Sequence, residues 1–389
     1  MAQWFAGVMR IVIVGGGLAG LRTAERLRRA GFDGSVTLVG GEPHAAYDRP
    51  PLSKKVLTQH DEPAEPAYLP TPADIDTLAG VHATALDTAG HRVVLDNGST
   101  VGYDRLVIAT GVRPRRLFDG WHGVHVLRTW TDGLALRSAL RDVKRIVVIG
   151  GGVLGCEVAA SARILGCDVT IVELLDQPLG AVLGDRVGAV IARMHRARGV
   201  DVRCSTRVSH FDGAGDRVER VVLADGAILD ADLVVMAVGT VPNTEWLAGS
   251  AVKVADGVLC DRTGATSAVN VFAAGDVARL PHPWADGTLR LEHWTAAGDT
   301  AALVARNILA APSDRVPLTA VPYFWTDQYQ SKFQVIGLPS ADDELTVIDG
   351  DLDGKFAAHY TRDGILTGAV TVGIPAALAP YRKLVGTPV

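Results

Sequence analysis

The chain has 389 residues, and at about 150 residues per domain this length corresponds to two or three domains. Lys and Arg total 38 against 43 Asp and Glu, and the net charge of -5 does not favour nonspecific nucleic-acid binding, which usually needs a basic protein. Hydrophobic residues make up 48% of the chain, as in ordinary globular proteins, whereas the 43 glycines exceed the usual share of about 7% and indicate special backbone positions.

The four cysteines argue against several kinds of site. Cys156, Cys167, Cys204 and Cys260 form no C-x-x-C pair and have no metal-ligand spacing, which disfavours a disulfide scaffold, a zinc ribbon and an iron-sulfur cluster. No metal site is expected. The sequence has no run of about 18 apolar residues, and its start, MAQWFAGVMR, lacks the apolar middle region of a secretory signal. We therefore expect a cytoplasmic protein, and we leave residues 1–8, an upstream extension or an added segment, out of the fold prediction.

The first predicted unit is a strand, a glycine turn and a helix. The apolar run IVIV at 11–14 predicts a buried strand, and a helix-period pattern follows from Leu18 to Leu27. Three glycines in the pattern G-x-G-x-x-G connect them: Gly15, Gly17 and Gly20. Gly31 is expected to end the helix in the left-handed conformation. A second strand, VTLV at 36–39, ends near Glu42.

The same order of elements returns 135 residues later, the separation of Gly15 and Gly150. The run IVVI at 146–149 leads into a second G-x-G-x-x-G pattern, made by Gly150, Gly152 and Gly155. A helix-period pattern continues to Leu165, and Gly166 is the expected helix end. The strand VTIV at 169–172 then leads directly into Glu173.

A hairpin and an apolar strand follow each copy. VLDNGSTVGYDRLVIATGVRP at 94–114 resembles VLADGAILDADLVVMAVGTVP at 222–242, and each contains an Asn-Gly or Asp-Gly turn. VFAAGDVARL at 271–280 is strand-like, and a helix is predicted from about Trp294 to Leu309. From Ala320 onward, short alternating strands predict a small α+β domain. The sequence therefore predicts an α/β fold with two Rossmann-like dinucleotide-binding domains and a small α+β C-terminal domain.

Each glycine turn has the context of a dinucleotide site. Glycines between a buried strand and a helix bring backbone N–H groups close to a pyrophosphate at the helix N-terminus. Glu42 and Glu173 follow at a distance from which a carboxylate accepts hydrogen bonds from ribose hydroxyls, so two dinucleotides are predicted. The Glu173 carboxylate would repel a 2'-phosphate, and residues 174–177 contain no Arg or Lys to hold one, so NADH is favoured over NADPH.

Six motifs together carry a family resemblance. Both glycine turns, with YDRPPLSK at 47–54, LVIATG at 106–111, AAGD at 273–276 and PYFWTDQY at 322–329, resemble the FAD-dependent ferredoxin reductases. These NADH-using enzymes are related to rubredoxin and putidaredoxin reductases and to the reductase of aromatic-ring dioxygenases. The resemblance runs from Arg10 to about Lys383 and implies a glutathione-reductase-like fold. The implied domains are an FAD-binding domain at 9–115 and 243–319, a NAD-binding domain at 116–242 and a C-terminal domain at 320–389.

The resemblance implies that the first glycine turn binds FAD and the second binds NAD. The implied FAD positions are Gly15, Gly17, Ala19, Gly20, Glu42, Arg49, Lys54, Ala83, Thr110, Gly111, Arg128, Asp276, Trp294 and Trp325. The implied NAD positions are Gly150, Gly152, Val153, Leu154, Gly155, Glu157, Glu173 and Gly239. Among them, Arg49, Lys54 and Arg128 would offset the phosphate charges and polarise the flavin, and Asp276 would accept a hydrogen bond from a ribityl hydroxyl.

Lys54 and Glu157 are the pair that the resemblance places nearest the nicotinamide, and both are predicted to be catalytic. An unpaired buried charge is costly, so each would compensate the other, and we predict an ion pair between them. Trp294 and Trp325 match family aromatics along the flavin and the nicotinamide entrance, where a flat ring stacks and excludes water.

Some positions bear on partner docking and on fine contacts. Ferredoxins are typically acidic, so docking to this acidic chain needs a local basic patch, and Arg306, Arg382 and Lys383 match regions that similar reductases use for it. Three features depart from the family pattern. They are Thr300 in place of a frequent Gln, Ala46 in place of a frequent Pro, and the segment TVGIPAALAP at 371–380 without its usual Asn and Arg.

Three functions of different classes remain open on the sequence. The first is a reductase that passes electrons from NADH through FAD to a small iron-sulfur ferredoxin serving a monooxygenase or dioxygenase, or to a rubredoxin. The second is a flavin disulfide reductase or peroxide-reducing oxidase, which needs a redox cysteine, but residues 40–60 contain none and Cys156 is expected to pack. The third is a non-catalytic flavoprotein that senses NADH. The sequence favours the first.

Overall fold

The computed structural model describes residues 8–61 and 63–389. The interpretation of residues 1–8 as an extension therefore lies outside the described residues, apart from Val8. The chain divides into two compact units, each assembled from three stretches. Unit 1 consists of the described residues up to Asp48, with Glu65–Arg113 and Val241–Ala320. Unit 2 consists of Arg49–Ala64, Pro114–Thr240 and Val321–Val389.

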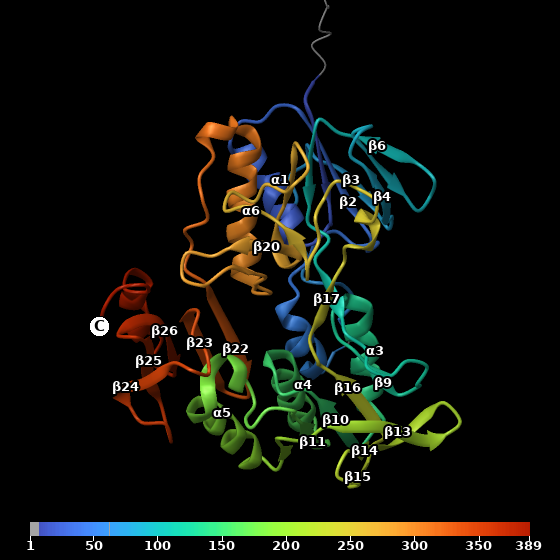
Figure 1. Cartoon of the computed structure of the whole chain (residues 1–389). Helices are drawn as coiled ribbons and strands as arrows, with labels where there is room; N and C mark the ends of the chain where they lie inside the picture. The colour runs from blue at the N-terminus through green and yellow to red at the C-terminus, as the bar shows by residue number, and fades with distance from the viewer. Residues whose placement is uncertain (1–7, 62) are drawn as a thin grey trace, which may run out of the picture. The chain divides into compact units, whose positions relative to one another are not determined.

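The core of unit 1 is a parallel sheet with two helices against it. Its five strands lie in the order β19-β7-β1-β2-β3. Their bounds are β1 Arg10–Val14, β2 Ser35–Gly40, β3 Asp76–Ala79, β7 Arg105–Ile108 and β19 Val271–Ala273. Helices α1 (Leu18–Arg29) and α6 (Trp294–Leu309) run side by side (Figure 1) and pack with Ile11 and Ile13. Val12 and Val14 join a second core, so β1 is buried on both faces, which explains its unbroken apolar run.

Shorter elements complete unit 1. An antiparallel meander consists of β4 (Ala83–Asp87), β5 (Arg92–Leu95) and β6 (Thr100–Gly102), and a small sheet consists of β18 (Val258–Leu259), β20 (Ala278–Pro281) and β21 (Thr288–Leu289). Single 3-10 turns are η2 (Glu245–Leu247), η3 (Gly275–Val277) and η4 (Pro312–Asp314). The predicted turn between β5 and β6 is confirmed, with Gly98 in the left-handed region at φ +81°.

Unit 2 contains a second parallel sheet, in the order β12-β11-β10-β16-β9. Its strands are β9 Val124–His125, β10 Arg145–Ile149, β11 Asp168–Val172, β12 Asp201–Arg203 and β16 Leu233–Met236. Its helices are η1 Pro50–Ser53, α2 Lys55–Thr58, α3 Trp130–Arg141, α4 Val153–Ile164 and α5 Gly180–Arg196. An antiparallel meander is made by β13 Val208–Ala214, β14 Arg217–Leu223 and β15 Ile228–Asp230.

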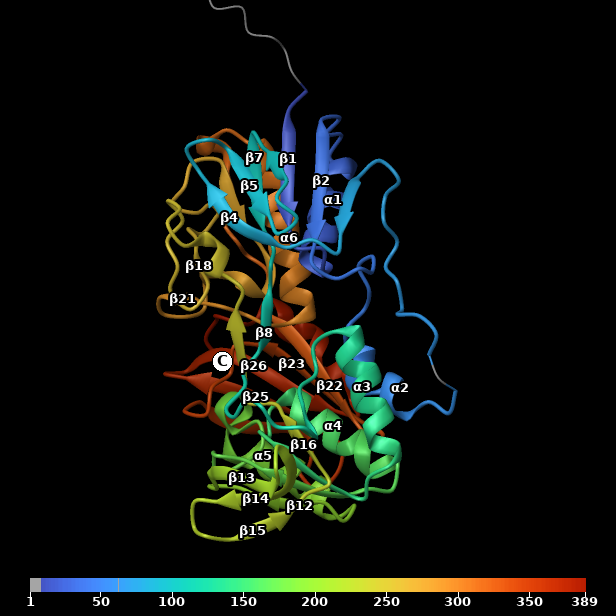
Figure 2. The ribbon, with the colours of Figure 1, turned by 90° about the vertical axis from the view of Figure 1, so that its right-hand side faces the viewer.

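The C-terminal residues of unit 2 form an antiparallel sheet in the order β22-β23-β26-β25-β24. Its elements are β22 Tyr323–Gln328, β23 Ser331–Gly337, β24 Glu344–Gly350, β25 Phe356–Arg362, β26 Ile365–Val372 and the helical segment η5 Pro375–Lys383. The sheet packs on α4 and α5 in one core that includes Cys156, Val187, Phe333 and Phe356 (Figure 2). The Tyr360 hydroxyl adds a buried hydrogen bond to the Leu183 carbonyl at 2.9 Å.

The predicted duplication is confirmed by strand pairing. In unit 1, β1 lies between β2 and β7, and in unit 2, β10 lies between β11 and β16, with parallel pairing in both. Both helices end where expected, since Gly31 and Gly166 have φ of +81° and +91°. Two of the places where the chain passes from one unit to the other lie within β8 (Val112–Pro114) and β17 (Thr240–Pro242). The predicted fold class is therefore correct.

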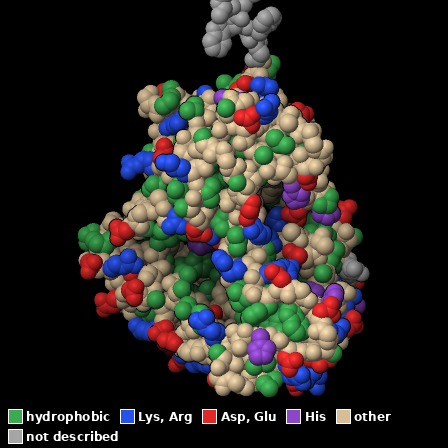
Figure 3. Space-filling view, turned by 45° about the vertical axis from the view of Figure 1, so that its right-hand side comes forward, with side chains coloured by type: hydrophobic (Ala, Val, Ile, Leu, Met, Phe, Trp, Pro, Cys, Tyr) green, Lys and Arg blue, Asp and Glu red, His purple; other side chains and the backbone are tan. Residues whose placement is uncertain are grey.

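The surface has no large region of one charge on the face shown in Figure 3, where acidic and basic side chains alternate. This distribution agrees with the small net charge of -5. Within residues 8–61 and 63–389, no helix is long and apolar enough to cross a membrane.

A buried arginine of α3 holds the segment after η1. Arg137 is 3% exposed, and its guanidinium donates to four backbone carbonyls. Nη1 donates to Val56 and Leu57 at 2.8 and 3.2 Å, and Nη2 donates to His60 and Asp61 at 3.2 and 3.0 Å. The planar fork of the guanidinium is therefore what orders residues 56–61.

We expect Arg137→Lys to loosen this segment although the charge is kept, because an ammonium group cannot reach four carbonyls at once. The free energy of unfolding should fall by about 1–3 kcal/mol, and trypsin should cleave faster after Lys54 and Lys55. Arg141→Lys, at an exposed position of the same helix, is the control and should change neither quantity. If trypsin cleaves Arg137→Lys no faster than the wild-type protein, Arg137 does not hold residues 56–61 in place.

Candidate active site

The two glycine turns have the same close-packed geometry. Gly15 and Gly150 have φ of +127° and +101°, and a Cβ on them would lie 2.0 Å from the Ala109 carbonyl oxygen and 2.3 Å from that of Ala237. A Cβ on Gly20 or Gly155 would lie 1.9 Å from the carbonyl oxygen of Gly15 or Gly150. In each copy the first turn of the helix therefore sits directly against the preceding strand, which only glycine permits.

The helix N-termini at these turns suit a bound anion. Within the described part of the chain, no side chain caps α1 at Gly17 or α4 at Gly152, and neither first turn holds an acid. By contrast, α3 has a complete capping box made by Thr129 and Asp132. Free backbone N–H groups at an uncapped helix start bind a pyrophosphate well, so the residues present fit a dinucleotide at each turn. Ala19 lies in the first turn of α1, and Val153 and Leu154 in that of α4.

The two predicted ribose acids have different local partners. The Glu42 carboxylate accepts from the Tyr47 hydroxyl at 2.6 Å. The Glu173 carboxylate, 9% exposed, accepts from the backbone N–H groups of Gly151 at 2.5 Å and Leu175 at 2.7 Å. These bonds fix the Glu173 carboxylate against the second glycine turn, where a ribose would lie.

The sequence analysis missed a backbone contact between Glu173 and Arg203. Arg203 of β12 pairs in register with Val172, and its carbonyl accepts from the Glu173 N–H at 2.8 Å. Its Nε is bonded to the Asp201 carboxylate at 2.8 Å. No local motif links Arg203 to the acid, because the contact arises only from parallel pairing of β11 with β12.

The structure brings Lys54 and Glu157 together, and the predicted ion pair is confirmed. Lys54 Nζ lies 2.7 Å from Glu157 Oε2, although the residues are 103 positions apart. The Glu157 side chain is 5% exposed and that of Lys54 is 22% exposed. Their part in catalysis stays a prediction.

Two hydroxyl groups that the sequence analysis missed complete the surroundings of Glu157. Ser53 Oγ donates to Oε2 at 2.6 Å, and Thr326 Oγ1 donates to Oε1 at 2.8 Å. Ser161 Oγ in turn donates to the Ser53 carbonyl at 2.6 Å. Ser53 and Thr326 belong to the family motifs YDRPPLSK and PYFWTDQY. The motifs contain these residues but do not indicate that both hydroxyl groups bind Glu157.

The remaining predicted FAD residues of unit 1 lie on turns and element ends. Thr110 and Asn243 exchange hydrogen bonds, with Thr110 Oγ1 2.7 Å from the Asn243 carbonyl, and Gly111 has φ +62°. Ala83 begins β4, and Gly239, at φ +89°, precedes β17 in unit 2. Trp294 starts α6 and donates from Nε1 to the Asp48 carboxylate at 2.8 Å.

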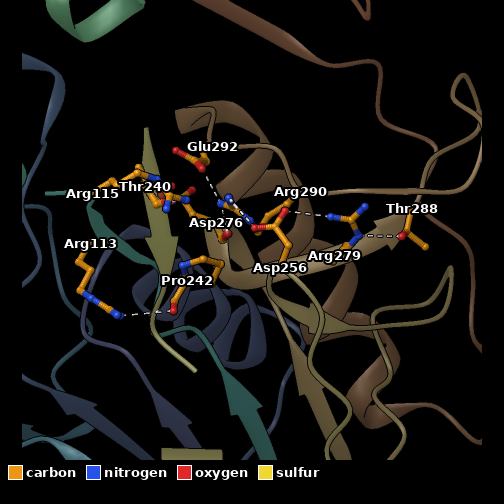
Figure 4. A network of polar contacts seen from close by, with 10 residues as sticks. All are labelled: Arg113, Arg115, Thr240, Pro242, Asp256, Asp276, Arg279, Thr288, Arg290 and Glu292. Carbon is orange, nitrogen blue, oxygen red and sulfur yellow. Dashed lines mark hydrogen bonds and ion pairs between the residues drawn. The ribbon is translucent and has the colours of Figure 1, made fainter. Parts of the chain in front are cut away.

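Asp276 lies in η3 at the centre of an arginine network (Figure 4). Arg290, whose side chain is 9% exposed, donates to the Asp276 carbonyl at 3.1 Å and pairs with Glu292 at 2.5 Å. Its other nitrogen lies 3.5 Å from Asp256, which Arg279 also binds at 2.9 Å. Thr300, which replaces a frequent Gln of the family, also stabilises the turn that contains Asp276, because its Oγ1 accepts a hydrogen bond from the Gly275 N–H at 2.9 Å.

Three further residues predicted to contact FAD belong to unit 2. Arg49 donates to the Arg128 carbonyl at 2.7 Å, so the structure brings these two arginines together. Trp325 on β22 stacks with Tyr323 at 6.0 Å and lies 5.5 Å from Lys332 Nζ. Their assignment to one FAD site with Gly15 stays a prediction.

The cysteines show no sign of redox chemistry. Cys156 is fully buried, its Sγ donates to the Gly151 carbonyl at 3.3 Å, and burial raises the pKa of its thiol far above the ordinary value. A reactive cysteine needs a lowered pKa and access, so packing is the role that this geometry supports. Within the described residues, no three His, Cys, Asp or Glu side chains gather as metal ligands.

The chain matches two family models. Residues 9–301 match the model of the pyridine nucleotide-disulphide oxidoreductases, and residues 323–388 match the reductase C-terminal domain.

Similar proteins include components of dioxygenase systems. The chain is 37% identical to the ferredoxin–NAD(+) reductase component of the p-cumate 2,3-dioxygenase system of Pseudomonas putida, over 97% of this chain and 93% of that protein. It is also 37% identical to the corresponding biphenyl dioxygenase component of Paraburkholderia xenovorans, with the same coverage. Among solved structures, the covalent putidaredoxin reductase–putidaredoxin complex aligns with a TM-score of 0.90 at 34% identity, over 97% of this chain and 93% of that one.

We expect matched glycine substitutions to separate the two turns. Gly20→Ala should leave the purified protein largely free of flavin, because its Cβ would clash with the Gly15 carbonyl oxygen at 1.9 Å. Gly155→Ala should keep its flavin but raise the KM for NADH about tenfold or more. Flavin absorbance and NADH titration measure the two effects. Equal flavin loss in both variants would show that the turns do not bind different dinucleotides.

The position of Glu173 also leads to a prediction on coenzyme choice. Glu173→Ala should lower kcat/KM for NADH by about tenfold and narrow the preference for NADH over NADPH, since the ribose loses an acceptor and a 2'-phosphate loses a repulsive charge. Asp176→Ala, a nearby acid that binds Ser205, is the control and should keep the wild-type preference. An unchanged coenzyme ratio in Glu173→Ala would show that the carboxylate points elsewhere.

Proposed function

The chain belongs to the pyridine nucleotide-disulphide oxidoreductases, and from this we propose that it is a ferredoxin–NAD(+) reductase, which passes electrons from NADH through FAD to a small iron-sulfur ferredoxin. It is an oxidoreductase, with FAD as its resident cofactor and NADH as its reductant. The ferredoxin serves a monooxygenase or dioxygenase, and the relatives described above belong to dioxygenase systems. The domain limits are those proposed from the sequence, with FAD bound by 9–115 and 243–319 and NAD by 116–242.

The observation that carries the proposal is the presence of two complete dinucleotide cradles in one chain. Gly15 with Gly20 and Gly150 with Gly155 make the same close approaches, and both helix starts lack a capping side chain within the described residues. A protein that binds a flavin dinucleotide and a nicotinamide dinucleotide has a donor and an acceptor for hydride. When bound, FAD would supply the conversion between the two-electron donor NADH and a one-electron acceptor such as a ferredoxin.

The residues of the chain supply binding, orientation and charge. The uncapped starts of α1 and α4 hold the two pyrophosphates, and Glu42 and Glu173 bind the ribose hydroxyls. Arg49, Lys54 and Arg128 provide positive charge. The Arg290 network holds the turn from which Asp276 binds the flavin side chain.

Glu157 and Lys54 act beside the nicotinamide. The carboxylate is held by Lys54, Ser53 and Thr326, so its two oxygens have defined directions before any nucleotide arrives. A preorganised charge of this kind orients the reacting ring at no cost during the reaction. The cysteines of the chain are all free thiols, in keeping with the reducing cytoplasm that we propose as its location.

A rapid-mixing experiment tests the function. The purified protein, yellow with about one FAD per chain, is mixed with NADH and then with an acidic [2Fe–2S] ferredoxin. Flavin bleaching should be fast with NADH, and the ferredoxin should reoxidise the flavin within the turnover time. Bleaching by NADH with no faster reoxidation by any ferredoxin than by oxygen would contradict the proposal and favour an NADH sensor.

We expect Glu157→Ala to slow flavin reduction by NADH about tenfold or more while the bound FAD content stays near wild type, since Glu157 belongs to the geometry of hydride transfer. Single-turnover flavin bleaching measures the rate. Asp353→Ala is the control, because it removes an exposed ion pair with Arg193 in the same unit and should have no effect. A rate within about twofold of wild type would contradict the role of Glu157.

The exposed cations predict a docking effect. Arg306 on α6 and Arg382 with Lys383 on η5 are all exposed. Arg306→Glu should raise the KM for the ferredoxin and make this KM less dependent on ionic strength. The reason is that electrostatic attraction of the ferredoxin acts only within a screening length of about 8 Å. Reduction of ferricyanide by NADH should stay near wild type. Equal losses with both acceptors would show that the substitution damages the flavin site and not docking.

A further inference from the structure

A chain of buried polar side chains leads away from Glu157 through the C-terminal sheet. Thr326 Oγ1 lies 2.8 Å from Glu157 Oε1, and Gln328 Nε2 lies 3.3 Å from Thr326 Oγ1. Gln328 Oε1 then lies 3.1 Å from His195 Nε2, and His195 Nδ1 lies 3.0 Å from the Tyr329 hydroxyl. The chain thus links α4, β22 and α5 within unit 2.

The three middle members are entirely buried. Thr326, Gln328 and His195 are each 0% exposed, in an interior that is otherwise apolar. Thr326 and Gln328 are two residues apart on β22, so both side chains point to the face that packs on the helices. Buried polar groups are costly unless all their hydrogen bonds are made, and an apolar residue would fill each position more cheaply. Packing alone does not account for them.

The charge of Glu157 fixes the direction of every hydrogen bond. A carboxylate only accepts, so the Thr326 hydroxyl must donate to it and can only accept from Gln328. The amide nitrogen of Gln328 therefore faces Thr326, and its oxygen accepts from His195, which must carry its proton on Nε2. His195 Nδ1 is then an acceptor for the Tyr329 hydroxyl. All four donors point toward Glu157.

His195 and Tyr329 are in the neutral forms that these hydrogen-bond directions require. Burial lowers the pKa of His195 from 6.5 to about 4, so the ring is neutral near pH 7. Burial raises the pKa of Tyr329 to about 12, so its hydroxyl keeps the proton that it donates. Arg198 lies 4.3 Å above the Tyr329 ring, at the outer end of the chain.

Tyr329 stands at the turn between β22 and β23. It is the first residue of the two-residue loop between Gln328 and Ser331, and its φ of +56° suits this tight hairpin turn. From the turn, its hydroxyl contacts His195 and its ring contacts the guanidinium of Arg198.

We propose that Thr326, Gln328, His195 and Tyr329 form a one-way donor chain that holds Glu157 as an oriented carboxylate, so that the C-terminal sheet takes part in the reaction with NADH. This inference rests on the proposed function, in which Glu157 acts beside the nicotinamide. The four residues are positioning residues, since they reach the reaction only through Glu157. Hydrogen bonds in series polarise one another. Loss of any one of these side chains therefore weakens the hydrogen bond that Thr326 donates to Glu157.

The charged and titratable groups around the chain can be named from each packed element. Lys54 faces Glu157 at 2.7 Å from the η1–α2 junction, and the buried Cys156 thiol lies beside it on α4. Arg198 faces His195 and Tyr329 from the end of α5, and Arg163 of α4 acts on Tyr329. The variants used in the test leave all of these groups in place.

The test compares Thr326→Val with Thr326→Ser in the FAD-loaded protein. Valine has nearly the same shape but no donor, so Glu157 Oε1 loses its hydrogen bond from Thr326. Flavin reduction by NADH should then slow about tenfold, while the FAD content and the KM for NADH stay near wild type. Serine keeps the hydroxyl and should retain the wild-type rate.

Thr371→Val is the matched control. Thr371 lies on β26 of the same sheet and is 1% exposed, and its hydroxyl has no hydrogen-bond partner in the described part of the chain. The substitution should leave the rate, the KM for NADH and the FAD content unchanged.

A second readout does not depend on activity. In protein labelled with ¹⁵N-histidine, the signal lost in His195→Asn identifies His195, whose neutral Nε2–H tautomer should persist at pH 6. Gln328→Leu should remove the acceptor and change this tautomer signal, whereas Thr371→Val should not. A protonated ring or an Nδ1–H tautomer in the wild-type protein would overturn the proposal.

The outcomes separate this inference from the proposed function. If Glu157→Ala slows flavin reduction but Thr326→Val keeps the wild-type rate, the donor chain is overturned and the function stands. If Glu157→Ala reduces flavin at the wild-type rate, the proposed role of Glu157 fails and the inference fails with it. A loss of rate in Thr326→Ser as large as that in Thr326→Val would also overturn the donor chain, because the loss would then not depend on the hydroxyl group.

Discussion

The arrangement of unit 2 depends on one buried carboxylate. Glu157 is 4% exposed, and a charge removed from water must be compensated by partners close to it. Its three partners, Ser53, Lys54 and Thr326, come from segments on either side of it in the chain. The segment of η1 and α2 and the C-terminal sheet therefore both contact α4. The same carboxylate gives the C-terminal domain a chemical reason to pack there, in addition to the apolar core that includes Phe324 and Phe333.

The duplicated glycine turn shows how one backbone solution serves two ligands. In both copies a left-handed glycine is followed by a glycine whose Cβ would lie 1.9 Å from a carbonyl oxygen, because both copies must place a helix N-terminus against a strand. What surrounds the two turns differs. Glu173 is bound to its own glycine turn and Glu42 to the Tyr47 hydroxyl, and the helix of the second copy carries the buried Glu157, which pairs with Lys54. Divergence of side chains on a repeated backbone is what allows one copy to suit FAD and the other NADH.

The two polar networks differ in how far they are buried. The Arg290 network lies partly at the surface, where Asp256 is shared between two arginines, and it holds the turn of Asp276 by charge. The chain from Glu157 to Tyr329 is buried, and each of its members has a single possible hydrogen-bond direction. Buried networks of this kind specify one arrangement because any alternative leaves a donor or acceptor unpaired.

The sequence by itself determined the features that local geometry dictates. The two βαβ units, the helix at 294–309 and the left-handed ends at Gly31 and Gly166 follow from periodicity and from the conformational freedom of glycine, which act within a few residues. The Lys54–Glu157 contact was predicted from motif resemblance supported by the cost of a buried charge. Only the tertiary structure decided which hydroxyls complete that site and that His195 stands behind it. Gln328 and His195 are 133 positions apart, and Thr326 and Glu157 are 169 apart. No spacing rule connects residues at such separations, because their contact is set by how α4, α5 and β22 pack together.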